Sequence, residues 1–328
     1  MYQADPKRYD HMQYRQVGTS GLHLPAISLG LWHNFGSVDP LSNQKALLEY
    51  AFDHGITHFD LANNYGPEPG SAESNFGRLF HSEFAAYRDE MIISTKAGYL
   101  MWPGPYGEWG SRKHIIASCD QSLRRLGLDY VDIFYHHRPD ENTPLAETAE
   151  ALAQLVRSGK ALYIGISNYK PEATVQMSTL LQDLHVPFII QQQRYNMFNR
   201  EPEQGLFQAL AKQHLGAITF SPLAQGLLSD RYLNGIPADS RAARSTSPFL
   251  HKDKVAATLA TVKKLNAIAQ NRGQSLAAMA LAWNLRQPVV ASVLVGASRT
   301  SQLAANLKAL DQLDFTDDEL AAIDAALQ

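Results

Sequence analysis

The sequence predicts one α/β domain, a (β/α)8 (TIM) barrel with an N-terminal β-hairpin and a C-terminal helix. Three observations predict this fold. Short apolar runs typical of strands alternate with amphipathic helical stretches along the chain. The runs are nearly continuous in Ile, Val and other apolar residues, which is typical of parallel strands covered on both faces. There are eight such units, and eight indicate closure into a barrel where six would indicate an open doubly wound sheet.

The predicted elements follow one another without long interruptions. The eight strands cover residues 26–30, 58–62, 91–97, 130–137, 161–167, 188–193, 217–222 and 292–297. Before them, residues 12–25 predict an antiparallel hairpin with a Thr-Ser-Gly turn that plugs the bottom of the barrel. After them, Thr316 followed by Glu319 predicts an N-capped C-terminal helix. Because repeats and linkers are absent from the sequence, residues 1–328 are expected to form a single domain.

Two longer loops stand out between these elements. Residues 99–112 are rich in Gly, Pro and Trp and follow the third strand, so we expect them to form a wall of the substrate pocket. A plain surface insertion is the alternative. Residues 228–254 predict a long polar loop after the seventh strand. Loops of that length are usually functional lids or disordered segments, and the sequence leaves open whether this one is ordered without a cofactor.

Composition excludes several classes of function. Of the 328 residues, 45% are hydrophobic and 19% charged, with a net charge of −3, which gives no general attraction to nucleic acid or anionic membranes. Apolar runs are too short to span a membrane, and the N-terminal residues lack the apolar core of a signal peptide. The single cysteine, Cys119, rules out an intrachain disulfide and a CxxC metal site. We therefore expect a cytoplasmic protein without a metal.

Four polar residues lie at or just after predicted strand ends: Asp60, Tyr65, Lys96 and His137. The carboxyl ends of barrel strands converge on one mouth, where active sites lie. Lys96 ends an otherwise apolar run, and lysines are seldom buried unless they are paired. A carboxylate, a phenol, an amine and an imidazole together can transfer protons, with the ammonium lowering the phenol pKa and the carboxylate keeping the ammonium charged.

Each of these residues also has an ordinary structural explanation. Lys96 could extend its ammonium to solvent, Asp60 could cap the next loop, and Tyr65 could be a loop aromatic. His136 and His137 are consecutive, so in a strand they point to opposite faces and only one reaches the mouth. The sequence contains no Rossmann GxGxxG after its first strand, no P-loop and no HExxH motif, so a bound nucleotide would be held in another way.

Five motifs occur in a characteristic order: DLANNYG, STKAG, HHRPD, GISNY and GASRTSQLAANL. With them the chain resembles the aldo-keto reductase superfamily over nearly its whole length. The segments LGLWHNFG, DLANNYGPEPGSAE, TKAGYLMWPGPYG and SPLAQGLL resemble the L-glyceraldehyde 3-phosphate reductase group, which is related to voltage-gated potassium-channel β subunits. The resemblance implies a catalytic tetrad of Asp60, Tyr65, Lys96 and His137. His137 is selected because the family histidine precedes a proline by two residues, here Pro139; channel β subunits typically carry Asn there.

The resemblance implies hydride transfer from NADPH to a small aldehyde, with Tyr65 as the proton donor and His137 orienting the carbonyl. Ser167, Asn168 and Gln192 would hold the carboxamide, and Phe220 would stack on the nicotinamide. Arg299 would meet the 2′-phosphate. The full set of implied cofactor-binding residues is Trp32, Asp60, Ser167, Asn168, Gln192, Phe220, Ser221, Pro222, Leu223, Gln225, Gly226, Arg231, Gly296, Ser298, Arg299, Gln302 and Asn306.

The substrate is less well defined by the resemblance. A phosphorylated triose or a methylglyoxal-like aldehyde is implied, in a pocket lined by Trp32, Tyr65, Trp102 and Trp109. A substrate phosphate could meet one of three cations, Arg112, Lys113 or Arg138.

Two positions depart from the family pattern. Ala305 replaces a common acidic residue near the adenine, and Arg194 lies in a segment that is usually less basic.

Two other functions stay open. Lys96 could form a Schiff base in an aldolase, or the protein could be a regulatory partner that binds cofactor without turnover. A homo-oligomer also remains open.

Overall fold

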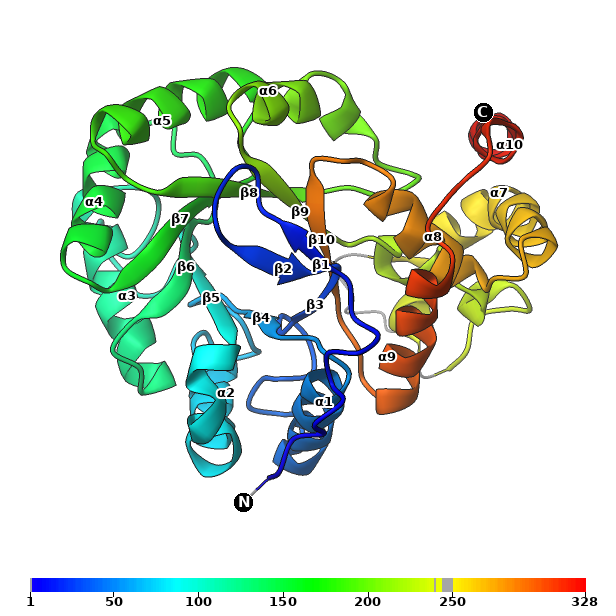
Figure 1. Ribbon diagram of the computed structural model, residues 1–328, viewed down its shortest axis with the longest axis horizontal. Coiled ribbons are helices and arrows are strands. Elements are labelled where there is room, and N and C mark those ends of the chain that lie inside the picture. Colours follow the sequence, from blue (N-terminus) through cyan, green and yellow to red (C-terminus); the bar gives the residue numbers. More distant parts are fainter. Residues whose placement is uncertain (1, 239, 244–249) are drawn as a thin grey trace.

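Eight parallel strands close into a barrel surrounded by helices (Figure 1), in a computed structural model that describes residues 2–238, 240–243 and 250–328. The strands are β3 Ile27–Gly30, β4 His58–Asp60, β5 Ile92–Ala97, β6 Val131–His136, β7 Ala161–Ser167, β8 Phe188–Arg194, β9 Gly216–Phe220 and β10 Val290–Val295. The barrel closes where β10 pairs with β3. The predicted fold class is confirmed, and all eight strands lie within about two residues of their expected bounds.

Helices follow the strands and cover the outside of the barrel, with α7 and α10 packed together beyond α8 (Figure 1). They are α1 Leu41–Asp53, α2 Ser71–Leu79, α3 Arg112–Leu126, α4 Leu145–Arg157, α5 Pro171–Asp183, α6 Leu206–Lys212, α7 Lys252–Asn271, α8 Leu276–Leu285, α9 Thr300–Leu307 and α10 Asp317–Leu327. Helix α10 begins at the capping box that the sequence predicts, with Thr316 and Glu319 each accepting a backbone N–H of the other.

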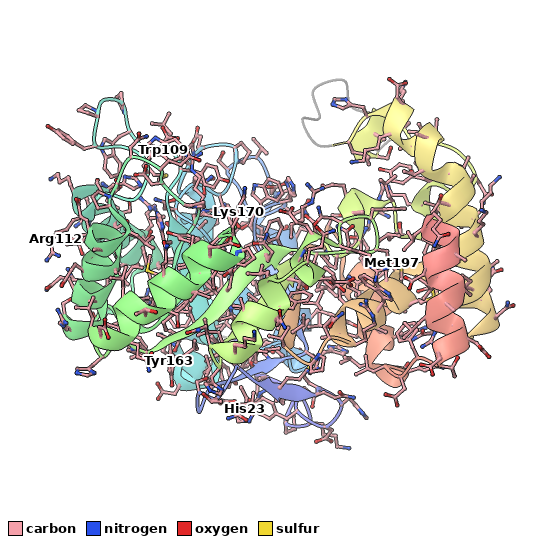
Figure 2. All side chains as sticks on the ribbon, turned by 90° about the horizontal axis from the view of Figure 1, so that it is seen from above. His23, Trp109, Arg112, Tyr163, Lys170 and Met197 are labelled. Atoms are coloured by element: carbon pink, nitrogen blue, oxygen red, sulfur yellow. The ribbon has the colours of Figure 1, made fainter. Side chains whose placement is uncertain are left out.

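The N-terminal hairpin closes one end of the barrel, as expected. Strands β1 Tyr14–Gln16 and β2 His23–Pro25 pair antiparallel. Val17 and Leu24 are fully buried and pack with residues of the barrel interior such as Ile133. Figure 2 shows His23 on this side and Trp109 on the opposite side of the barrel. The plugged end leaves the carboxyl ends of the strands as the open mouth.

The segment 228–254 is more structured than the predicted loop. Its described part contains 3-10 turns at Asp230–Tyr232 and Arg241–Ala243, and α7 already begins at Lys252. Burial of Tyr232 and Leu250 accounts for this order, because both side chains pack into the main apolar core. Residues 239 and 244–249, and with them part of this predicted loop, lie outside the described residues.

Candidate active site

Strand pairing brings the four candidate residues to the same mouth. Asp60 is the last residue of β4 and lies opposite Ser94 of β5, and Lys96 of β5 lies opposite Tyr135 of β6. Tyr65 follows β4 in the loop to α2, and His137 is the residue after β6. Three neighbouring strands, together with residues that follow two of them, therefore supply all four side chains.

Lys96 is fully buried, and each of its three donors has an acceptor. Its Nζ donates to Asp60 Oδ2 at 2.6 Å, to the carbonyl oxygen of Leu61 at 2.6 Å and to Tyr65 Oη at 3.3 Å. An ammonium has three N–H donors, so this set of acceptors is complete. Because Tyr65 Oη accepts from Lys96, its own phenolic proton remains for another acceptor.

Burial has the largest effect on the pKa of the Tyr65 phenol, and the sequence expectation considered only Lys96. Burial raises the pKa of Tyr65 well above its usual value, and the charges of Asp60 and Tyr99 add to the effect. Burial also lowers the pKa of Lys96, against the attraction of Asp60. The Asp60 carboxylate opposes the field of the ammonium at Tyr65. Without a ligand, Tyr65 is therefore a neutral phenol near neutral pH.

The two consecutive histidines point to opposite sides, as strand alternation predicts. The ring centroid of His137 lies 6.0 Å from that of Tyr65 and 4.7 Å from that of Tyr99. The side chain of His136 instead hydrogen-bonds Tyr169. Burial, followed by the charges of Lys96 and other cationic groups nearby, lowers the pKa of His137 well below its usual value. His137 is thus a neutral imidazole at the mouth.

The three candidate tryptophans have different surroundings. Trp32 has its ring centroid 6.3 Å from that of Tyr65, which places it beside the tetrad. Trp109 stacks under the guanidinium of Arg138, with 3.7 Å between the guanidinium carbon and the ring centroid. Trp102 packs on His114 of α3 at 5.0 Å. This contact turns Trp102 toward the helix layer, so Trp32 and Trp109 are the better candidates for the pocket wall.

Among the cations considered for a substrate phosphate, Arg138 lies beside the tetrad. It follows His137, and its guanidinium lies between the rings of Tyr99 and Trp109. Its Nε donates to the carbonyl oxygen of Gly98 at 3.0 Å, and the group forms an ion pair with Glu108. Arg112 and Lys113 are exposed residues at the start of α3.

Apart from Trp32, which follows β3, and Asp60, which ends β4, the residues implied for a cofactor lie in four consecutive segments around the same rim. Ser167 ends β7 and Gln192 lies in β8, where its Nε2 donates to Asp60 Oδ1 at 3.2 Å. Asn168 Nδ2 donates to Ser167 Oγ and to the carbonyl oxygen of His137, both at 3.0 Å. The other two segments follow β9 and β10. They contain Phe220, Ser221, Pro222, Leu223, Gln225, Gly226 and Arg231, and then Gly296, Ser298, Arg299, Gln302 and Asn306.

The backbone of these last two segments fits a phosphate-containing ligand. Ser221, Ala224 and Gln225 all have left-handed φ values, of 55°, 48° and 63°. Such strain in non-glycine residues clusters at ligand-binding sites. Arg299 is the N-cap residue of α9, where helix N–H groups and a guanidinium together suit an anion. The donor set is thus consistent with a dinucleotide held across the mouth.

The sequence interpretation missed several residues of the site. Ser94 donates to Asp60 Oδ1 at 2.7 Å, and His58 contacts Ser94 Oγ through Nε2 at 2.9 Å. Both could have been found by the two-residue period of a strand, because His58 precedes Asp60, and Ser94 precedes Lys96, by two positions. Tyr99 lacked such a signal, since it lies in an irregular loop.

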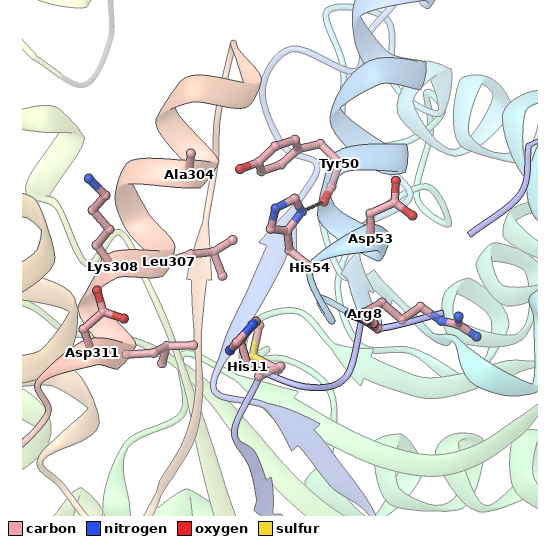
Figure 3. A pocket seen from close by; sticks show the side chains of 12 residues that line it. Arg8, His11, Tyr50, Asp53, His54, Ala304, Leu307, Lys308 and Asp311 are labelled. Carbon is pink, nitrogen blue, oxygen red and sulfur yellow. Dashed lines mark hydrogen bonds between the residues drawn. The ribbon is translucent and has the colours of Figure 1, made fainter. Parts of the chain in front are cut away.

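A surface cavity of about 200 Å³ lies elsewhere, between the N-terminal segment, the end of α1 and the α9 region (Figure 3). In it, His54 stacks on Tyr50 and its Nδ1 lies 2.8 Å from the carbonyl oxygen of Tyr50. Lys7, His11 and Lys308 also line it. It is near the carboxyl end of α1 and therefore away from the mouth.

A parallel barrel that brings a carboxylate, an amine, a phenol and an imidazole together at its mouth has the architecture of an enzyme. The chain belongs to the aldo/keto reductase family, whose model matches residues 26–328. It is 60% identical over 325 residues to L-glyceraldehyde 3-phosphate reductase of Escherichia coli O157:H7, covering 98% of this chain and 94% of the relative. This protein is accordingly an oxidoreductase.

Two further comparisons agree with this family. The chain is 38% identical over 306 residues to a probable voltage-gated potassium channel subunit beta of Arabidopsis thaliana, covering 92% of each protein. The holo form of an aldo-keto reductase from Bacillus halodurans superposes with a TM-score of 0.78 at 26% identity, covering 97% of each chain.

Within the described residues, no helix is long and apolar enough to cross a membrane. The same residues contain no group of three or more His, Cys, Asp or Glu side chains that could hold a metal ion.

Proposed function

We propose that this protein reduces small aldehydes with NADPH and that Tyr65 donates the proton to the carbonyl oxygen. The observation that carries the proposal is the set of contacts around Lys96. The buried ammonium is held by Asp60 at 2.6 Å and donates to Tyr65 Oη at 3.3 Å. A phenol held by a buried cation is suited to release its proton as negative charge develops on a nearby oxygen.

Each tetrad residue has one part in this reaction. Tyr65 is a neutral phenol before substrate binds, so it holds the proton that reduction requires. Lys96 stabilises the phenolate that remains after the transfer. Asp60 keeps Lys96 charged and directed at Tyr65. His137, as a neutral imidazole, orients the carbonyl by a hydrogen bond rather than by giving up a proton.

NADPH, when bound, supplies the hydride. Ser167, Asn168 and Gln192 would hold its carboxamide, and Phe220 would stack on the nicotinamide ring. The strained segment 221–226 and Arg231 would accept the pyrophosphate, and residues 296–306 the adenosine end. Arg299 beside the first turn of α9 supports a preference for NADPH over NADH, because a guanidinium pairs well with the 2′-phosphate.

A phosphorylated triose is the substrate class we favour. Two observations support it. The relative with 60% identity is named for L-glyceraldehyde 3-phosphate, and Arg138 lies beside His137 with its guanidinium held between two rings. A phosphate would compete with Glu108 for that guanidinium. A methylglyoxal-like aldehyde, which has no phosphate, is the alternative substrate.

A regulatory role without turnover is the second candidate function. It is favoured by the 38% identity to a probable channel β subunit. The histidine at position 137, where such subunits typically carry Asn, favours the reductase.

The decisive experiment is an aldehyde panel assayed with NADPH and with NADH, following the loss of nicotinamide absorbance. We expect steady NADPH oxidation, faster with L-glyceraldehyde 3-phosphate than with unphosphorylated glyceraldehyde. Arg138→Met should reduce that difference and leave the rate with glyceraldehyde nearly unchanged. Cofactor binding with no turnover on any aldehyde would favour the regulatory role. Borohydride trapping of a carbonyl compound on Lys96 would favour an aldolase.

A further inference from the structure

A chain of buried polar side chains continues from the tetrad into the barrel. Ser94 Oγ lies 2.7 Å from Asp60 Oδ1, and His58 Nε2 lies 2.9 Å from Ser94 Oγ. On the other side of the ring, His58 Nδ1 lies 2.9 Å from Ser28 Oγ. Ser28 Oγ lies 2.6 Å from Ser292 Oγ, which donates to the carbonyl oxygen of Pro25 at 2.6 Å. His58 and the three serines are fully buried.

Both ends of this chain are acceptors, and this fixes the direction of its two terminal hydrogen bonds. A carboxylate and a carbonyl oxygen only accept, so Ser94 must donate to Asp60 and Ser292 must donate to Pro25. A hydroxyl has one proton. Ser94 therefore has none left for His58, and the contact between them requires a proton on His58 Nε2.

The remaining protons leave one contact unfilled. The chain has five contacts, whereas three serines and one neutral imidazole supply four protons. Burial lowers the pKa of His58 to about 4, with Asp60 opposing and Lys96 reinforcing the shift, so the ring is neutral near neutral pH. Counting protons alone leaves two arrangements, in which the unfilled contact lies either between Ser94 and His58 or at Ser28. The charge of Asp60 decides between them, because an Nε2–H bond to Ser94 strengthens the bond of that hydroxyl to the anionic carboxylate, whereas an Nδ1–H bond leads only to the neutral carbonyl oxygen of Pro25. We therefore assign the proton to His58 Nε2.

We propose that His58 is a positioning residue for the reduction, acting through Ser94 on Asp60. This inference rests on the proposed function. The Nε2–H bond commits the hydroxyl proton of Ser94 to Asp60 Oδ1, which also accepts from Gln192 at 3.2 Å. With Oδ1 occupied by two donors, Oδ2 is left to Lys96 at 2.6 Å. His58 thereby fixes the rotation of the carboxylate that aims Lys96 at Tyr65.

Mutation of the serine on each side of the His58 ring tests this directionality. Ser94→Ala should lower kcat about tenfold, the usual scale for one lost hydrogen bond to a charged group, while KM for NADPH stays near wild type. Ser28→Ala is the matched control, because it removes a hydroxyl from the same ring at Nδ1. We expect it to leave kcat unchanged. Equal losses in the two variants would overturn the proposal.

A double-mutant cycle then tests the route. His58→Leu should lower kcat about tenfold in the wild-type background and less than about twofold in the Ser94→Ala background, because its effect passes through Ser94. His58→Gln retains one donor and one acceptor and should restore most of the activity. If His58→Leu still lowered kcat tenfold in the Ser94→Ala background, His58 would act on the site by a route other than Ser94, and the proposal would be overturned. If the leucine variant does not fold, His58→Gln decides: a tenfold loss there overturns the proposal.

The tautomer gives a measurement that does not need catalysis. In protein with 15N-labelled histidine, His58 should show a protonated Nε2 and an unprotonated Nδ1 at neutral pH. A proton on Nδ1 instead would overturn the directionality. If the wild type reduces no aldehyde, the proposed function fails, whereas the tautomer still reports on the His58–Ser94 arrangement by itself.

Discussion

Two buried carboxylate–cation pairs lie on opposite sides of the same strand. Inside the barrel, Asp60 holds Lys96, and both side chains are almost completely buried. Outside it, Glu73 of α2 is equally buried and accepts from Arg125 of α3 at 2.7 Å. Glu73 also accepts from Thr95, the residue before Lys96. Strand alternation places Lys96 on the inner face of β5, in the first pair, and Thr95 on the outer face, where it contacts the second.

The two pairs differ in the other contacts that their cations make. Arg125 also donates to Ser122 of its own helix and packs against Gly70, so the outer pair joins two helices to the strand. Lys96 directs its remaining donor at Tyr65, whose proton is available to the mouth. The same chemistry thus serves packing on one face and, we propose, proton transfer on the other.

The strongest test of the inner pair is to remove the hydroxyl group of Tyr65, to which Lys96 donates. Tyr65→Phe should lower kcat by roughly 10²–10⁴-fold, the usual range for a general acid. Affinity for NADPH should stay near wild type, because the phenolic proton is used only during reaction. Fluorescence titration and steady-state kinetics measure the two effects. A variant that retains most of its turnover would remove Tyr65 as the proton donor.

Replacing the two cations separates the roles of the pairs. Lys96→Met should reduce turnover nearly as much as Tyr65→Phe, because the phenolate loses its stabilising charge. Arg125→Met should instead cost roughly 3 kcal/mol of stability, at the low end for a broken buried pair, since 21% of its side chain is exposed. Its kcat should be close to wild type. Chemical denaturation and kinetics on both variants provide the comparison, and a large loss of turnover in Arg125→Met would contradict it.

The consecutive histidines at the end of β6 allow the same kind of comparison, because His137 faces the mouth and His136 faces the other side. His137→Asn should lower kcat by roughly 10²-fold while cofactor still binds, because the carbonyl loses its orienting group. His136→Asn should mainly lower stability, since the buried side chain of His136 hydrogen-bonds Tyr169, between β7 and α5. Kinetics and thermal unfolding decide between them. An inactive His136 variant beside a normal His137 variant would place the wrong histidine in the tetrad.

The barrel could be predicted because most of its strands are nearly continuous apolar runs, as in 161–167, where predicted and observed bounds coincide. The tetrad could be predicted because polar residues at strand ends are conspicuous against those runs. His58 and Ser94 were overlooked although they share the strand faces of Asp60 and Lys96. Tyr99 and the placement of Trp102 depend on loop packing that has no sequence period.

The direction of the net pKa shift of Tyr65 could not be predicted from the sequence for a different reason. The sequence identified the cation but not the desolvation of the phenol or the compensating charge of Asp60. Burial of the phenol opposes ionisation more strongly than one paired ammonium favours it, so the pKa rises. A motif identifies the partners, whereas the sign of a pKa shift depends on how deeply the three-dimensional structure buries them.

The smallest of these effects concerns a cation that is expected to act in binding rather than in chemistry. Arg299→Ala should weaken NADPH binding roughly 10- to 100-fold, the cost of about 1.5–3 kcal/mol for a lost bond to a charged group. NADH lacks the 2′-phosphate, so its affinity should change little, and kcat with saturating NADPH should stay near wild type. In this respect Arg299 would differ from Lys96, whose loss should affect kcat. Fluorescence titration with both cofactors makes the measurement. Equal weakening of NADH and NADPH would place Arg299 away from the 2′-phosphate and would leave the preference for NADPH to other residues of 296–306.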